Sequence, residues 1–176
     1  MTREQLEHII RASGTIADVD DIVVIGSQAV LGEYPDAPPE LLISTEADVF
    51  PRDHPERSDM IDGTIGDGSP FQKSFGYYAH GIGESTAVLP AGWRERLVLV
   101  SGENTRFVRG WCLEIHDLTI AKYAAGREKD LEFTAIVTRH RMVDRARLEE
   151  RLTVTAVDRQ TRDRIAQRIQ NDFAQN

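Results

Sequence analysis

Two carboxylates stand at alternate positions of a strand-like stretch, ISTEADVF at 43–50. Alternate residues of a strand point to the same face, so Glu46 and Asp48 are expected side by side. Like charges held that close resist joint ionisation unless a cation lies between them. Mg²⁺ suits such a place, because it prefers oxygen ligands and is commonly shared between protein carboxylates and substrate phosphates. The pair therefore predicts a metal site for phosphate chemistry.

A glycine-serine turn precedes the two acids. DIVVIG at 21–26 is an apolar run of strand length closed by glycine, and SQAVLGEY follows it as a short helix or turn that Ser27 is expected to cap. Backbone amides at a helix start hold phosphates because they point outward unpaired, and glycine admits close approach. Gly26 and Ser27 are therefore predicted to bind nucleotide phosphates, with the Ser27 hydroxyl as a further donor.

The remaining pattern predicts an α/β (α+β) fold, in which a mixed sheet is flanked by helices and followed by a C-terminal helical extension. A helix over 3–13 ends at Gly14, the prolines of 35–40 impose a loop, and LLISTEADVF at 41–50 forms the second strand. The glycine-rich stretch 63–92 is largely irregular. Further strands are expected in 75–82, 96–101 and 108–115, and further helices in 54–66, 117–125, 128–139, 144–152 and 158–173.

Two sequence blocks resemble a known superfamily. Gly26-Ser27 followed by Glu46-Ala47-Asp48-Val49 resembles the signature of the nucleotidyltransferases, a glycine-serine turn and a later acid-apolar-acid-apolar strand. EIHDLTIAKYAAGREKDLEF at 114–133 is similar to the helical block of the abortive-infection toxin nucleotidyltransferases. GSQAVLG and PAGWRERLV also resemble an uncharacterised bacterial branch of that group, known as a domain of unknown function (family 6036). The resemblance covers roughly residues 20–150 and implies a nucleotidyltransferase-like core at 1–116, with the helical region 117–176 packed on it.

The resemblance implies a function as well as a fold. It implies Mg²⁺-dependent transfer of a nucleoside monophosphate from a nucleoside triphosphate to an acceptor hydroxyl on RNA, especially tRNA, or on protein, and a possible role in a toxin–antitoxin pair with a cognate antitoxin. Glu46 and Asp48 would hold the metal. Lys122, which the resemblance implies is catalytic and nucleotide-binding, would neutralise the triphosphate with help from Arg127 and Lys129.

The residues themselves leave alternatives open. The family pattern usually has aspartate where this chain has Glu46, and the 18 residues between Ser27 and Glu46 form a longer gap than usual. The alternative function is therefore a catalytically silent binding or regulatory module with this fold. For Lys122 the alternative is a surface charge near a helix end, and Asp130 is expected to pair with Arg127 or cap a helix.

A third acid is expected from a strand beside the pair. Glu114 in WCLEI is the choice for this metal ligand, and an exposed strand residue is its alternative. Asp117 competes for the role, but an aspartate that opens DLTIAKYAAG is better explained as a helix cap.

Bulk properties exclude several classes of protein. A net charge of −8 argues against broad nonspecific binding of nucleic acid. Neither a secretory signal nor an apolar run of about 18 residues is visible, so we expect a cytoplasmic protein with no membrane contact. Cys112 is expected in the core. The scattered His54, His80, His116 and His140 lack the spacing of a zinc site.

Overall fold

A computed structural model describes residues 1–174 of the chain. Within this range, the search for a helix long and apolar enough to cross a membrane finds none. Contacts divide the chain into two compact units, the first comprising 1–86 and 97–113, the second 87–96 and the residues from 114 onward. The predicted boundary between residues 116 and 117 stays a prediction, because a unit defined by contacts need not be a domain that folds alone.

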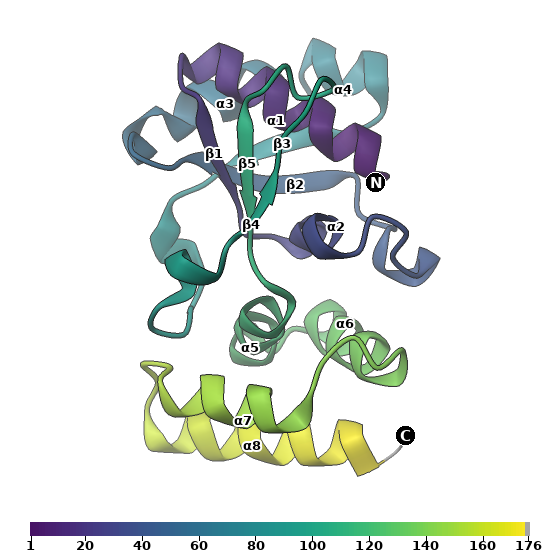
Figure 1. The fold of residues 1–176 in the computed structure, drawn as a ribbon, viewed down its shortest axis with the longest axis vertical. Coiled ribbons are helices and arrows are strands. Elements are labelled where there is room, and N and C mark those ends of the chain that lie inside the picture. Colours follow the sequence, from purple (N-terminus) through teal and green to yellow (C-terminus); the bar gives the residue numbers. More distant parts are fainter. Residues whose placement is uncertain (175–176) are drawn as a thin grey trace. The chain divides into compact units, whose positions relative to one another are not determined.

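The first unit contains the predicted mixed sheet (Figure 1). Its strands are β1 (Asp21–Val24), β2 (Glu46–Pro51), β3 (Tyr78–Gly81), β4 (Val98–Val100) and β5 (Arg109–Cys112), in the order β3-β2-β1-β5-β4. β1 runs antiparallel to β2 and parallel to β5, while β3 runs parallel to β2 and β4 antiparallel to β5. The predicted fold class, an α/β (α+β) chain with a mixed sheet flanked by helices, is confirmed.

One face of this sheet is covered by helices of the same unit. α1 (Arg3–Ala17) packs on β5 where Ile10 meets Gly110, and α3 (Ser58–Ile65) lies so close to β3 that a Cβ on Gly81 would stand 2.1 Å from the Ser58 carbonyl oxygen. α2 (Val30–Glu33) meets the same face at Cys112. Side chains that alternate with these positions point to the opposite face. That second face, which we call the site face, carries the two predicted metal ligands.

The first helix runs further than its glycine suggests. α1 continues through Gly14 to Ala17 and ends at Asp18, which adopts a left-handed conformation with φ 52° and donates its backbone N–H to the Gly14 carbonyl. A Cβ on Gly14 would lie 2.7 Å from Val108 Cγ1. The predicted end at Gly14 is wrong, because this glycine permits close packing within the helix and does not end it.

Other elements of the first unit differ from prediction in extent. The second strand was expected from residue 41 but begins at Glu46, because Pro39–Leu41 forms a 3₁₀ turn. α4 (Pro70–Phe75) lies in the stretch expected to be irregular. Ser69 caps it by accepting from the Gln72 N–H, and proline opens its first turn. The remaining 3₁₀ turns of this unit are Ser27–Ala29, Pro55–Arg57 and Glu84–Thr86, and Trp93–Arg96 forms one in the second unit.

The second unit contains four helices among its described residues, and all four match prediction within two residues at each end. They are α5 (Ile115–Ala125), α6 (Glu128–Arg139), α7 (Arg145–Thr153) and α8 (Arg159–Ala174). Gly126 ends α5 in a left-handed conformation, and Asp144 caps α7 by accepting from the Arg147 N–H.

A buried ion-pair cluster ties residues 87–96 to these helices. Asp117 on α5 is fully buried and accepts from Arg96 Nε at 2.8 Å and Nη2 at 3.0 Å, while Arg151 Nε of α7 lies 3.2 Å from its Oδ1. A β-bridge between Pro90 and Thr155 supports the same segment. A segment that precedes two strands of the sheet therefore belongs to the helical unit through these contacts.

Cys112 is confirmed as a core residue. Its side chain is fully buried on β5, and burial raises the pKa of its thiol to about 12. The thiolate is the reactive form of cysteine, so this position is chemically inert at neutral pH.

Candidate functional site

The two predicted metal ligands do lie side by side. Glu46 and Asp48 alternate along β2, and the parallel register of β3 places Tyr78 opposite Glu46 and His80 opposite Asp48. Small residues, Ala47 and Ala79, pair between them and face the helices. The site face therefore presents four polar side chains from two neighbouring strands.

These side chains contact one another directly. His80 Nδ1 lies 3.1 Å from Asp48 Oδ1 and 3.4 Å from Glu46 Oε1. The Tyr78 hydroxyl donates to Glu46 Oε2 at 2.6 Å, which leaves Oε1 toward His80. One ligand atom from each of Glu46, Asp48 and His80 lies within 4.8 Å of the other two. Two carboxylate oxygens and an imidazole nitrogen form a donor set that suits a divalent cation.

The electrostatics of the group favour an added positive charge. Burial raises the pKa of Asp48, and the neighbouring Glu46 carboxylate raises it further. The hydrogen bond to Glu46 raises the pKa of Tyr78, which keeps its proton for that carboxylate. A bound dication would relieve the repulsion between Glu46 and Asp48.

The glycine-serine turn packs against one of the acids. The Ile25 N–H donates to the Asp48 carbonyl at 3.1 Å, and a Cβ on Gly26 would stand 2.0 Å from Asp48 Oδ2. Gly26 is itself the N-terminal flank of the turn Ser27–Ala29, so the Ser27 side chain is not the cap that the sequence suggested. Only glycine leaves room at this position for the carboxylate of Asp48. A backbone turn and a candidate metal ligand thus share one small space.

Replacement of Gly26 by alanine is expected to displace the Asp48 carboxylate, because 2.0 Å is far inside van der Waals contact. Overpacking of this kind costs about 1 to 3 kcal/mol in the free energy of unfolding. It should also reduce the rise in melting temperature that Mg²⁺ produces. Gly63→Ala on α3 is the matched control, since a Cβ there meets nothing within 4 Å. Equal Mg²⁺ responses in the two variants would contradict this account of Gly26.

The predicted third acid caps a helix in the second unit. Glu114 is the N-cap of α5, where its side chain accepts from the backbone N–H groups of His116 and Asp117 and contacts the His116 ring. Burial would raise the pKa of Glu114, but these hydrogen bonds hold it below its ordinary value. The strand position expected for Glu114 and the cap expected at Asp117 are both wrong. A role for Glu114 as a metal ligand stays a prediction.

The predicted phosphate-binding cations lie on α5, on α6 and at the turn between them. Lys122 is nearly buried, with its Nζ 3.2 Å from Asp130 Oδ1 and 5.6 Å from the centre of the Phe133 ring. Arg127 Nε donates to Asp130 Oδ2 at 2.6 Å, which confirms the predicted pairing of those two residues. Lys129 is exposed in the first turn of α6. Their contact with a nucleotide stays a prediction.

His80 and Tyr78 are the functional candidates that sequence reasoning missed. His80 was considered with the other histidines and set aside for lack of metal-site spacing. The available signal was the alternation of Tyr78 and His80 in YYAHG, which matches that of Glu46 and Asp48 in TEADV. Two strands with polar residues on the same alternate positions place those residues together when the strands pair.

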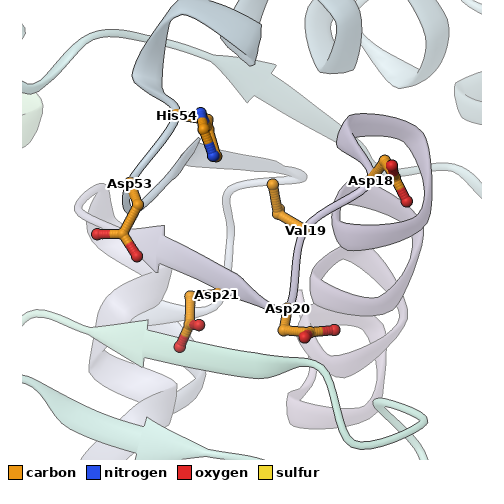
Figure 2. A pocket seen from close by; sticks show the side chains of 6 residues that line it. All are labelled: Asp18, Val19, Asp20, Asp21, Asp53 and His54. Carbon is orange, nitrogen blue, oxygen red and sulfur yellow. The ribbon is translucent and has the colours of Figure 1, made fainter.

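A separate hollow lies at the opposite end of β1. It has a volume of about 210 Å³ and is lined by Asp18, Val19, Asp20, Asp21, Asp53 and His54 (Figure 2). Asp21 is engaged there by Arg109 and by the Trp111 Nε1–H, which donates at 2.6 Å. Four carboxylates in one hollow repel a triphosphate, so this feature does not suit nucleotide phosphates.

Comparison with known proteins identifies the family of the chain. A family model described as a nucleotidyltransferase of unknown function (DUF6036) matches residues 4–175. A search of curated proteins and a search of solved structures give no match.

Proposed function

The chain belongs to this nucleotidyltransferase family, and from that premise we propose that it transfers a nucleoside monophosphate from a nucleoside triphosphate to an acceptor hydroxyl. Families of this kind typically use a divalent metal ion, and we assign Mg²⁺ to Glu46 and Asp48, with Glu114 as the predicted third acid. The observation that carries the proposal is the contact between Gly26 and Asp48, a possible metal ligand beside a turn that suits phosphate.

The residues of the first unit divide the work between metal and phosphate. Glu46 and Asp48 supply carboxylate oxygens, and the backbone of Gly26 and Ser27 supplies amide donors close to Asp48. A dication bound there would neutralise charge on the triphosphate and orient it for displacement of pyrophosphate. Because the turn and the acids are neighbours, the phosphates and the cation would share a single position on the site face.

The residues of the second unit supply positive charge. Lys122, Arg127 and Lys129 are assigned to the triphosphate, in line with the family resemblance. Asp130 holds the first two at 3.2 Å and 2.6 Å, so it fixes where their charges lie. Burial alone would raise the pKa of Asp130, but the hydrogen bonds and positive charges of Arg127 and Lys122 outweigh it and leave this pKa below its ordinary value, which keeps the carboxylate charged at neutral pH.

RNA, especially tRNA, or a protein side chain is proposed as the acceptor, and a toxin–antitoxin pair with a cognate antitoxin as the biological setting. Both proposals rest on resemblance to the abortive-infection toxins. The alternative function is a catalytically silent binding or regulatory protein. Glu46 favours the alternative, since it stands where the family usually has aspartate.

A thermal-shift panel of four ribonucleoside triphosphates, with and without Mg²⁺, tests the site without a choice of acceptor. A triphosphate at 100 times its dissociation constant should add about 2.7 kcal/mol to stability. For a chain of this size that raises the melting temperature by roughly 5 to 11 °C. Transfer of a labelled nucleotide to total RNA or protein then separates the two functions, because a silent protein shows the shift alone. No shift with any triphosphate would reject both.

A further inference from the structure

We propose that His80 is the third ligand of the cation site and that its imidazole makes the site prefer a first-row transition-metal dication, such as Mn²⁺, to Mg²⁺. This inference rests on the proposed function, because it concerns the same cation site. It differs from the sequence-based expectation in both the third ligand and the metal. The inference begins from the strand register, which puts His80 directly opposite Asp48.

The spacing of the three side chains fits direct coordination. Neighbouring ligands around an octahedral ion with bonds of 2.1 Å lie about 3.0 Å apart. His80 Nδ1 stands 3.1 Å from Asp48 Oδ1 and 3.4 Å from Glu46 Oε1. Small rotations of the side chains suffice to open this group around an ion. Tyr78 holds the far oxygen of Glu46, so the near oxygen is directed to the same point.

The side chains are also reachable from solvent. The exposed fractions are 36% for Glu46, 27% for Asp48 and 48% for the His80 side chain. A dication can therefore enter without unfolding the strands and keep water ligands that a triphosphate displaces. A fully buried group would offer neither route.

The nature of the donors determines which metal is preferred. Carboxylates and water suit Mg²⁺, whereas an imidazole nitrogen is a softer donor that suits transition metals. A site of two carboxylates and one histidine gives Mg²⁺ only two protein ligands of the type it favours. Mn²⁺ accepts the same octahedral oxygens and binds nitrogen more strongly than Mg²⁺ does. His80 therefore shifts selectivity without removing the oxygen ligands.

The alternative explanation is that His80 is only an ion-pair partner of the two acids. The chain contains a matched example of such a pair. His54 Nδ1 lies 3.1 Å from Glu56 Oε1, and its side chain is 49% exposed. His54 thus resembles His80 in its contact with a carboxylate and in its exposure, but it contacts one carboxylate in place of two. His54→Ala is accordingly the control for every measurement below.

The test measures metal binding by the purified full chain after removal of metal with a chelator. Titration of Mn²⁺, followed by the signal of free Mn²⁺ in electron paramagnetic resonance, gives its dissociation constant, and competition gives that of Mg²⁺. His80→Ala should weaken Mn²⁺ binding at least about 10-fold, the lower end of the effect seen when even an outer partner of a metal ligand is lost. His80→Asp should lower the ratio of Mn²⁺ to Mg²⁺ affinity by a similar factor. His54→Ala should leave both constants unchanged.

Pulsed electron paramagnetic resonance detects direct coordination of Mn²⁺ by nitrogen, a signal that would be absent if His80 had only a structural role. Mn²⁺ bound to the unmodified chain should show nitrogen hyperfine coupling from the imidazole, and His80→Asp should abolish it. Coupling that persists in His80→Asp, or Mn²⁺ affinity unaffected in His80→Ala, would overturn the inference. Failure of the proposed function can be distinguished from failure of this inference. A chain that binds Mn²⁺ through His80 but transfers no nucleotide refutes the proposed function alone. Transfer supported by Mg²⁺ with no role for His80 refutes this inference alone.

Discussion

Asp48→Asn is expected to lower the rate of nucleotide transfer by about 100-fold or more, the size of effect that follows the loss of one key electrostatic contact in an active site. Asparagine keeps the shape of the side chain and one oxygen, but it removes the charge that holds a dication beside the Gly26 turn. The change also removes the like-charge repulsion with Glu46, which contributes to the raised pKa of Asp48. The variant should therefore fold normally while it loses transfer and the Mg²⁺ response.

Single-turnover transfer of a labelled nucleoside monophosphate measures this effect. Asp53→Asn is a matched control, because Asp53 lies in the acidic hollow at the other end of β1. It should transfer at the rate of the unmodified chain. Glu46→Asp should keep metal affinity within a modest factor if the protein is active, and should gain no measurable activity if it is silent. Full activity in the Asp48→Asn variant would show that the Asp48 carboxylate has no role in the reaction.

Asp117→Ala is expected to destabilise the second unit by about 3 to 5 kcal/mol, the usual cost of removing one partner from a buried ion pair. The fully buried carboxylate holds Arg96 through two hydrogen bonds and faces Arg151 on α7. Burial raises the pKa of Asp117 despite both guanidiniums, so the ion pair itself adds little net stability. The cost arises because Arg96 loses its carboxylate partner and Arg151 keeps, among the described residues, only its pair with the exposed Glu150.

Denaturant unfolding measures this loss, and the chain offers a probe for each unit. Trp93 lies in the second unit and Trp111 in the first, so a variant with only Trp93 reports the helical unit by fluorescence. Glu149→Ala is the control, since Glu149 forms an exposed pair with Arg145 on α7. Its effect should stay within about 0.5 kcal/mol. A loss below about 1 kcal/mol for Asp117→Ala would mean that the arginines find other partners or water.

The parts of this fold that sequence could predict are those encoded by neighbouring residues. DIVVIG has the length and β-branched composition of a buried strand, and three helices of the second unit, α5, α7 and α8, begin at acidic side chains that accept from backbone N–H groups. Glu46 and Asp48 follow from the two-residue period of a strand. Each of these features is set within about ten residues of chain, where periodicity and capping act.

The missing part of the candidate site depends on pairing between distant segments. His80 meets Asp48 only because β3 adds to β2 in parallel, and no local pattern fixes that register. Glu114 and Asp117 show a second limit. Both acids stand three residues apart at a helix start, so either is compatible with a cap, and the structure selects Glu114. At Gly14, the approach of Val108 overrides the tendency of glycine to end a helix.

The parallel pairing of β2 with β3 has a thermodynamic consequence. Asp48 and His80 are 32 residues apart in the chain, and the intervening segment crosses over through α3. An ion bridging them would hold this long loop closed in the folded state, and it would stabilise the fold because it binds the folded chain and not the unfolded one. Each tenfold excess of free dication over its dissociation constant would add about 1.4 kcal/mol to folding. Trace metal in a buffer would therefore raise the free energy of unfolding measured for the first unit, so its concentration must be controlled in such measurements.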